Sequence, residues 1–248
     1  MEKESTTQEK AFLKLPSIQE LFDASVHLGH KTSRWHPKMK PYIFGAKHGV
    51  HFFNLEKTLK QLEDALIFLR NVLSRGGLIL FVGTKPAAKN IVKEIAQALN
   101  MPYVFERWLG GTLTNFKTIN KRLKYLLELE KQQAEGAWDN FTKKERLMQE
   151  RKMQKLQKQL VGLRNLSKIP EAIFIADIKK DELSLKEAKL VKSKVVAICD
   201  SNVDPSDVDY PICGNDDATT SIRIILETLK NNLADVKVSL PIEEDKKL

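Results

Sequence analysis

Apolar and polar positions alternate along the chain with two different spacings, which predicts a succession of helices and strands. From Leu55 to Ser74 the leucines recur every three or four residues, which places them on one helical face. Gly76-Gly77 follows, and then LILFV, a continuous apolar run typical of a strand covered on both faces. Pro86 suits the first turn of another helix, which we expect to end near Leu99.

The same alternation resumes in the last third of the chain. We expect a helix over 183–192, and a helix that Asn215 caps and that runs to about Asn232. Strands separated by helix-length segments indicate βαβ units, so the predicted fold class is α/β, with a mainly parallel sheet flanked by helices. The strands are expected at 102–105, 172–177, 194–200 and 210–213, with an irregular strand or hairpin over 44–53.

A long helical segment interrupts this alternation and differs from the rest in charge. Between Lys117 and Arg164 the chain has 13 basic and 6 acidic residues. Narrow apolar seams flank the Gly-containing EGAWDN turn, which predicts an inserted, antiparallel coiled-coil helical hairpin. The expected domains are therefore an α/β domain from 17–116 and 167–232, a hairpin at 117–166, and flexible tails at 1–16 and 233–248.

Composition favours a polyanionic partner. The formal net charge is +9, from 41 Lys and Arg against 32 Asp and Glu, and 42% of the residues are apolar, enough for a core. The segment 171–217 is locally acidic, so the molecule is electrically polarised. The first residues resemble neither a signal peptide nor a transit peptide, and we interpret Cys199 and Cys213 as reduced thiols. We therefore expect a soluble protein made inside a cell or an organelle, without a membrane partner.

All five histidines lie between His27 and His51, in a segment rich in lysine and arginine. Their spacing matches no usual zinc signature, the cations would repel a metal ion, and no carboxylate stands in register with Ser25 or Ser33 for nucleophilic catalysis. Cations instead alternate with flat rings, a pattern suited to phosphates and stacked bases, although Trp35 is as easily explained by packing on the domain. These residues are Lys31, Arg34, Trp35, His36, Lys38, Lys40 and Tyr42.

The turn in FVGTKPAAKN is the most enzyme-like feature. Thr84 and Lys85 lie between a strand and a helix, where α/β proteins bind phosphate, but one glycine cannot supply a phosphate cradle. We favour an ordinary turn whose Lys85 and Lys89 are free to meet backbone phosphates. The alternative is a phosphate- or nucleotide-binding enzyme that uses Thr84, Lys85, Asp177 and Asp200.

RWLGGTLTNFKTI lies at the root of the predicted hairpin. Gly110-Gly111 allows a tight bend that exposes N–H groups to a phosphate, while Thr114 or Asn115 can cap the first hairpin helix. Both uses can coexist. Further along, several aspartates near strand ends could hold magnesium, but we favour capping of helices. These are Asp200, Asp204, Asp216 and Asp217.

Seven motifs follow one another between about Ser17 and Leu229: VHLGHKTSRWHPKMKPYIFGAKHGVHFFNLEKT, LFVGTKPAA, RWLGGTLTNFKTI, FTKKERLM, AIFIAD, DSNVDP and YPICGNDDAT. In this order and spacing they resemble the bacterial and organellar form of the small-subunit ribosomal protein two family. The resemblance implies a flavodoxin-like sheet with a protruding hairpin and no catalysis. It also implies an RNA-binding place between the head and body of the small subunit, and support for docking of ribosomal protein one in bacteria.

From residues and resemblance together we expect a structural constituent of the small ribosomal subunit, with neither metal nor cofactor. Its expected partners are small-subunit rRNA and neighbouring ribosomal proteins, in bacterial cytoplasm or on an organelle-encoded ribosome. A protein-docking module using the acidic half is a third possibility. The expected RNA-binding residues are His30, Lys31, Arg34, Trp35, His36, Lys38, Lys40, Lys47, Lys85, Arg107, Trp108, Thr114, Asn115 and Lys117.

Overall fold

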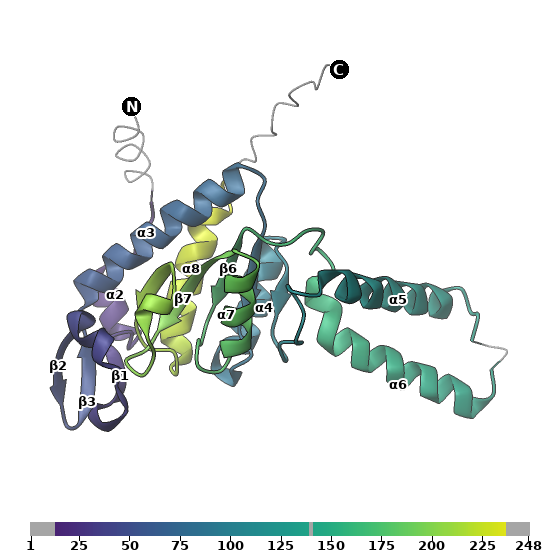
Figure 1. Cartoon of the computed structure of the whole chain (residues 1–248), viewed down its shortest axis with the longest axis horizontal. Helices are drawn as coiled ribbons and strands as arrows, with labels where there is room; N and C mark the ends of the chain where they lie inside the picture. The colour runs from purple at the N-terminus through teal and green to yellow at the C-terminus, as the bar shows by residue number, and fades with distance from the viewer. Residues whose placement is uncertain (1–12, 139–140, 237–248) are drawn as a thin grey trace, which may run out of the picture.

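A five-stranded parallel sheet forms the centre of the molecule (Figure 1). The computed structural model describes residues 13–138 and 141–236. The strand order is β5-β4-β6-β7-β8, so the first strand of the sheet in sequence lies between the second and the third, as in flavodoxin-like folds. The strands are β4 (Ile79–Val82), β5 (Tyr103–Val104), β6 (Ala172–Ile175), β7 (Lys194–Cys199) and β8 (Tyr210–Cys213).

Helices cover both faces of this sheet, and the alternation of side chains along each strand divides the core in two. Phe81 and Phe174 are partners in adjacent strands, and their ring centroids lie 5.7 Å apart on the face covered by α3, α4 and α8. Leu80 and Ile173 belong to the opposite face, which α7 covers. The helices are α3 (Leu55–Ser74), α4 (Pro86–Ala98), α7 (Glu182–Leu190) and α8 (Thr219–Leu233). The predicted α/β fold class is confirmed.

Local sequence explains where most of these helices begin. Asn54 caps α3 by accepting a hydrogen bond from the Lys57 N–H, and Pro86 occupies the first position of α4. The prediction that Asn215 caps the last helix was wrong, because α8 begins four residues later. The Asn215 side chain instead accepts hydrogen bonds from the N–H groups of Asp217 and Ala218, which closes a turn before the helix.

A second, three-stranded antiparallel sheet lies at one end of the molecule beside α2 (Ile18–Asp23) (Figure 1). It consists of β1 (Leu28–Lys31), β2 (Ile43–Lys47) and β3 (Val50–Phe53), in the order β1-β3-β2. The predicted hairpin is β2–β3, turned at His48-Gly49 with positive φ at both residues. Two 3-10 helices, Thr32–Arg34 and Pro37–Tyr42, join β1 to β2.

The inserted segment forms two paired antiparallel helices that extend from the domain (Figure 1). Their facing sides are apolar where the sequence predicted, with Leu126 fully buried in α5 (Phe116–Ala134) and Leu160 fully buried in α6 (Lys143–Leu160). Lys152 Nζ donates to the Tyr125 hydroxyl at 2.6 Å, which links the two helices. Their coiled-coil character stays a prediction.

Short segments at either end of the α/β domain meet each other. Within the predicted N-terminal tail, the Lys14 N–H donates to Asn232 Oδ1 at 2.8 Å, and Asn232 Nδ2 donates back to the Lys14 carbonyl at 3.0 Å. The rest of the predicted tails, 1–12 and 237–248, lies outside the described residues. Among the helices that the structure describes, none combines the length and apolar character needed to cross a bilayer.

Candidate nucleic-acid interface

The carboxyl ends of the parallel strands hold a network of buried charges around Lys85. This lysine follows β4 and is the residue just before α4, at the point where the order of a flavodoxin-like sheet reverses and ligands usually bind. Its Nζ lies 2.9 Å from Asp177, 2.7 Å from Asp216 and 2.7 Å from Asp217. Burial alone would lower the pKa of Lys85, but the three carboxylates raise it above its ordinary value. Lys85 is therefore held as a structural cation.

Thr84 is held by the same kind of contact. Its backbone N–H and its hydroxyl donate to the two oxygens of Asp181, at 3.2 Å and 2.7 Å. Burial of Asp181 raises the pKa of its carboxyl above the ordinary value, although both bonds from Thr84 oppose that change. The N–H group that would bind a phosphate in a nucleotide-binding turn is thus already used by an internal carboxylate.

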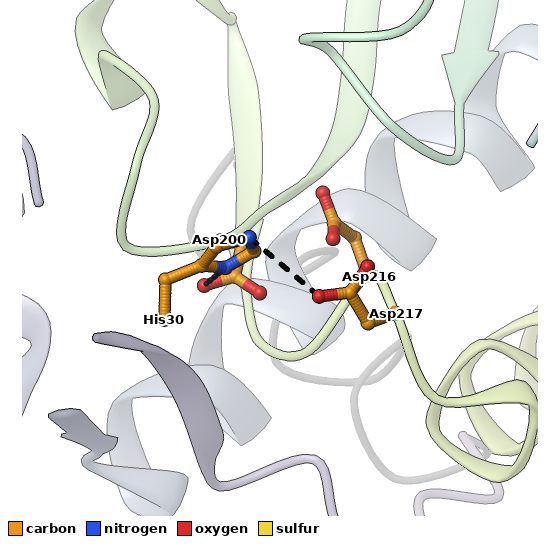
Figure 2. Close-up of side chains that lie close together, drawn as sticks. All are labelled: His30, Asp200, Asp216 and Asp217. Atoms are coloured by element: carbon orange, nitrogen blue, oxygen red, sulfur yellow. Dashed lines mark ion pairs between the residues drawn. The ribbon is translucent and has the colours of Figure 1, made fainter. Parts of the chain in front are cut away.

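His30 joins this network from β1 (Figure 2). Its Nδ1 lies 3.0 Å from Asp200, and its Nε2 lies 3.5 Å from Asp217. The hydrogen bond with Asp200 raises the pKa of His30, and this effect outweighs burial. Atoms of His30, Asp200, Asp216 and Asp217 lie within 4.8 Å of one another, but the Lys85 ammonium already contacts two of these carboxylates, so we assign no metal here.

The internal contacts at these strand ends oppose binding of a phosphate at Lys85. In the part of the chain that the structure describes, Lys85 contacts Asp177, Asp216 and Asp217, His30 contacts Asp200 and Asp217, and Thr84 contacts Asp181. A nucleotide phosphate would therefore have to displace internal carboxylates from the lysine and the threonine of this turn. The predicted contact between Lys85 and RNA remains untested, and the three ion pairs of this lysine make it unfavourable.

The pKa of Asp216 predicts how stability depends on pH. Burial, with the nearby charges of Asp177 and Asp200, raises this pKa to about 7 in spite of Lys85. Between about pH 4 and pH 7 the folded protein then keeps a proton that the unfolded chain has lost, so stability falls as the pH rises through this window. We expect Asp216→Asn to make the free energy of unfolding less dependent on pH there, as measured by urea denaturation.

The exposed Asp64 on α3 offers the matched control. Asp64→Asn removes one carboxyl group outside the network and should follow the pH profile of the unchanged protein. Equal pH dependence in all three proteins would contradict the assignment of Asp216 as a group protonated near neutral pH.

The amino-terminal basic segment, residues 26–52, is anchored to the α/β domain by the loop after β7. Ser201 accepts from the His30 N–H through its hydroxyl at 2.9 Å, and from the His36 N–H through its carbonyl at 2.7 Å. Lys38 Nζ lies 2.7 Å from Asp204 and 2.8 Å from the Ser206 hydroxyl. The charge of Lys38 is therefore partly neutralised by a surface ion pair, whereas sequence alone grouped Lys38 with the free cations.

The remaining cations of this segment are exposed. None of them has an ion pair within residues 13–138 and 141–236. The Trp35 side chain is 37% exposed, and its ring centroid lies 5.3 Å from that of His51. The ring nitrogen Nδ1 of His36 accepts from the Lys38 N–H at 3.4 Å. The exposed cations are Lys31, Arg34, Lys40 and Lys47.

The root of the helical hairpin is built around Glu187 of α7. Its Oε1 accepts from Trp108 Nε1 at 3.0 Å and from the Gly111 N–H at 2.8 Å. Its Oε2 accepts from the Leu113 N–H at 3.0 Å, and from the N–H and hydroxyl of Thr114, both at 3.2 Å. Trp108 is only 6% exposed, which makes its predicted RNA contact unfavourable. Arg107, Asn115 and Lys117 are exposed on the same root.

Sequence reasoning missed two contributors to this surface. Lys179 and Lys180 are exposed after β6 and, with Arg34, line a hollow of about 270 Å³ above the charged network. These two lysines were not predicted because they lie in the segment 171–217, which is locally acidic. Glu187 was missed because a glutamate in a charged helix is usually solvated, and the residues around it in the sequence do not indicate that its side chain is buried.

These observations define a class: a flavodoxin-like protein in which internal ion pairs hold the lysine of the usual ligand crevice, and whose exposed cations lie on the amino-terminal segment, at the hairpin root and after β6. Comparison with known proteins gives the family. The model of the family described as ribosomal protein S2 matches residues 21–235. The chain belongs to the ribosomal protein S2 family.

Curated relatives agree over nearly the same span. The small ribosomal subunit protein uS2 of Shewanella amazonensis is 46% identical over 211 residues, which is 85% of this chain and 87% of that protein. The protein of the same name from Fusobacterium nucleatum is 45% identical over 220 residues, 88% of this chain and 89% of that protein. The predicted resemblance is confirmed.

Proposed function

We propose that this protein is a structural constituent of the small ribosomal subunit, where it binds rRNA through its amino-terminal segment and the root of its hairpin. Membership of the ribosomal protein S2 family and the names of its bacterial relatives support the ribosomal role. The rRNA contacts rest on one observation: Lys31, Arg34 and Lys40 are exposed without an ion pair in the described part of the chain, as binding to phosphates requires.

The proposed division of roles follows from which cations are free. Arg34 and Lys40, with Lys47, would neutralise backbone phosphates, and the exposed part of Trp35 would stack on a base or ribose. Arg107 and Lys117 would contact phosphates at the hairpin root, and Lys179 with Lys180 would add a further basic patch. Cations that are already paired, such as Lys38, would contribute less.

The proposed role is structural and not enzymatic. The alternative of a nucleotide-binding enzyme used Thr84, Lys85 and Asp200, and all three are engaged with internal partners. Relatives named as ribosomal proteins give no support to it. The bacterial source of these relatives favours a place on the ribosome of the bacterial cytoplasm.

Neighbouring small-subunit proteins are the proposed protein partners, with ribosomal protein one among them in bacteria. A hollow of about 540 Å³ between α2 and the small antiparallel sheet supports a protein contact. Its apolar rim is unusually exposed for a soluble domain, because Phe44 is 81% and Phe22 52% exposed.

Sedimentation with small subunits tests this proposal. The protein, added to subunits that lack their own copy, should travel with the subunit peak, and Arg107→Gln with Lys117→Gln should be released at lower salt because two phosphate contacts are lost. Lys60→Gln with Lys93→Gln is the matched control, because it removes the same amount of charge from exposed positions outside the proposed contact regions. Recovery of the unchanged protein only at the top of the gradient, even at low salt, would reject the proposal.

A further inference from the structure

Glu187 is a buried carboxylate whose five hydrogen bonds all lead to one loop. It is 4% exposed, and its donors come from Trp108, Gly111, Leu113 and Thr114, within the eleven residues that join β5 to α5. Burial by itself raises the pKa of this carboxyl, but the bonds from Trp108 and the backbone outweigh it, so the pKa lies below its ordinary value. Glu187 is therefore an anion when the protein is folded at neutral pH.

The loop around Glu187 has the form of an anion-binding turn. Gly111 has a positive φ of 89°, a conformation that turns successive N–H groups toward one point. The Thr112 N–H and hydroxyl both donate to the Leu109 carbonyl, and the Asn115 N–H donates to the Gly111 carbonyl, which fixes the turn on either side. The bound anion is thus a side chain of the protein itself, and these N–H groups are not available to an external phosphate.

The same loop carries Arg107 and leads into the first turn of α5, which carries Lys117. Arg107 lies next to Trp108, and Lys117 lies in the first turn of α5, two residues beyond Asn115. Bonds from Glu187 to both Trp108 and Thr114 therefore fix the backbone on either side of the bend from which these cations project. Because α7 packs against β6 and β7, Glu187 ties the root to the rigid sheet.

We propose that Glu187 is a positioning residue for rRNA binding, which orders the loop between β5 and α5 so that Arg107 on this loop and Lys117 in the first turn of α5 reach phosphates together. This inference rests on the proposed function, because it assigns a task to a residue that itself touches no RNA. Pre-ordering matters because a loop that must be ordered during binding loses affinity through the entropy of that ordering. Trp108 and Thr114 then act through Glu187, as residues that hold the loop.

The first measurement follows the loop in the free protein. Glu187→Gln keeps the size of the side chain and an acceptor oxygen for Trp108 and Gly111, but it removes the charge and places an NH₂ group opposite the donors of Leu113 and Thr114. We expect the amides of Gly111, Leu113 and Thr114 to exchange hydrogen about 10- to 100-fold faster, because charge-assisted bonds are lost. Glu182→Gln, an exposed change on the same helix, should leave these amides as they are.

The second measurement separates positioning from general stability. Binding to full-length small-subunit rRNA is compared for Lys117→Gln and Lys40→Gln, each made both in the unchanged protein and together with Glu187→Gln, under conditions where all variants are folded. If Glu187 positions the hairpin root, the loss of rRNA affinity caused by Lys117→Gln should be about 3- to 10-fold smaller in the Glu187→Gln background than in the unchanged protein. The loss caused by Lys40→Gln, on the distant amino-terminal segment, should be the same in both.

The outcomes distinguish this inference from the proposed function. Unchanged amide exchange in Glu187→Gln overturns the positioning role. An equal loss of rRNA affinity from Lys117→Gln in both backgrounds also overturns the positioning role, but it leaves the proposed rRNA contact of Lys117 intact. If Lys117→Gln and Arg107→Gln have no effect even with Glu187 present, the proposed contact at the root itself fails, and the task assigned to Glu187 fails with it.

Discussion

Replacement of Arg34, Lys40 and Lys47 together by glutamine is expected to reduce affinity for small-subunit rRNA on the order of 100-fold at moderate salt. Each of these exposed cations lies without an ion pair in the described parts of the chain, so each can release a counterion from a phosphate. The slope of log affinity against log salt should become shallower by about 3, about one for each contact that is lost. Filter binding over a range of salt concentrations measures both quantities.

A triple variant on other surfaces provides the control for net charge. Lys60, Lys93 and Lys192 are exposed and belong to none of the three proposed contact regions. Their replacement by glutamine lowers the net charge by the same amount, and should change the slope only slightly. If the two triple variants lose affinity equally, binding depends on total charge, and the assigned contact residues are wrong.

Gly162→Ala is expected to cost about 3 kcal/mol of folding free energy, at the upper end of what overpacking usually costs. Gly162 lies where the returning hairpin helix reaches β5, and a Cβ atom there would lie 2.1 Å from the Tyr103 carbonyl oxygen. That oxygen belongs to the backbone of an edge strand of the sheet, which cannot move away as a flexible side chain would. Urea denaturation of the intact chain measures the loss.

Gly45→Ala is a matched change in β2 that meets no atom within 4 Å. It should alter the free energy of unfolding by less than about 0.5 kcal/mol, as surface substitutions usually do. A Gly162→Ala variant as stable as Gly45→Ala would show that the root of the hairpin can shift away from β5 without loss.

Periodicity was enough to predict the central sheet and its helices. The apolar run of β4 and the leucine spacing of α3 are local signals, and both elements formed at the expected places. Strand β1 was missed because Leu28–Lys31 has neither an apolar run nor β-branched residues, and its pairing with β3 comes from contacts made elsewhere in the chain. Helix α2 is too short to show a repeating pattern, with six residues.

The charged site could be predicted only in part. Lys85 stands where phosphate-binding lysines stand, but its partners Asp177 and Asp216 follow other strands and meet it only after the sheet has formed. The predicted capping role is confirmed for Asp204, whose side chain accepts from the Ser206 N–H at the start of the 3-10 helix Pro205–Asp207. Asp200, Asp216 and Asp217 instead contact His30 or Lys85, which lie far away in the sequence. The fold alone would have pointed to a ligand crevice here, so the function had to be argued from side chains.

The position of the hairpin between β5 and β6 also affects how the chain can fold during synthesis. Ile79 of β4 pairs with Ala172 of β6, so roughly 90 residues must leave the ribosome before the centre of the sheet can close. At ordinary translation speeds this takes about 5 to 20 s, during which one edge of β4 has no partner. During this time a chaperone can bind the exposed edge of the nascent amino-terminal half. The two hairpin helices need only local contacts, so they can form before β6 has been synthesised.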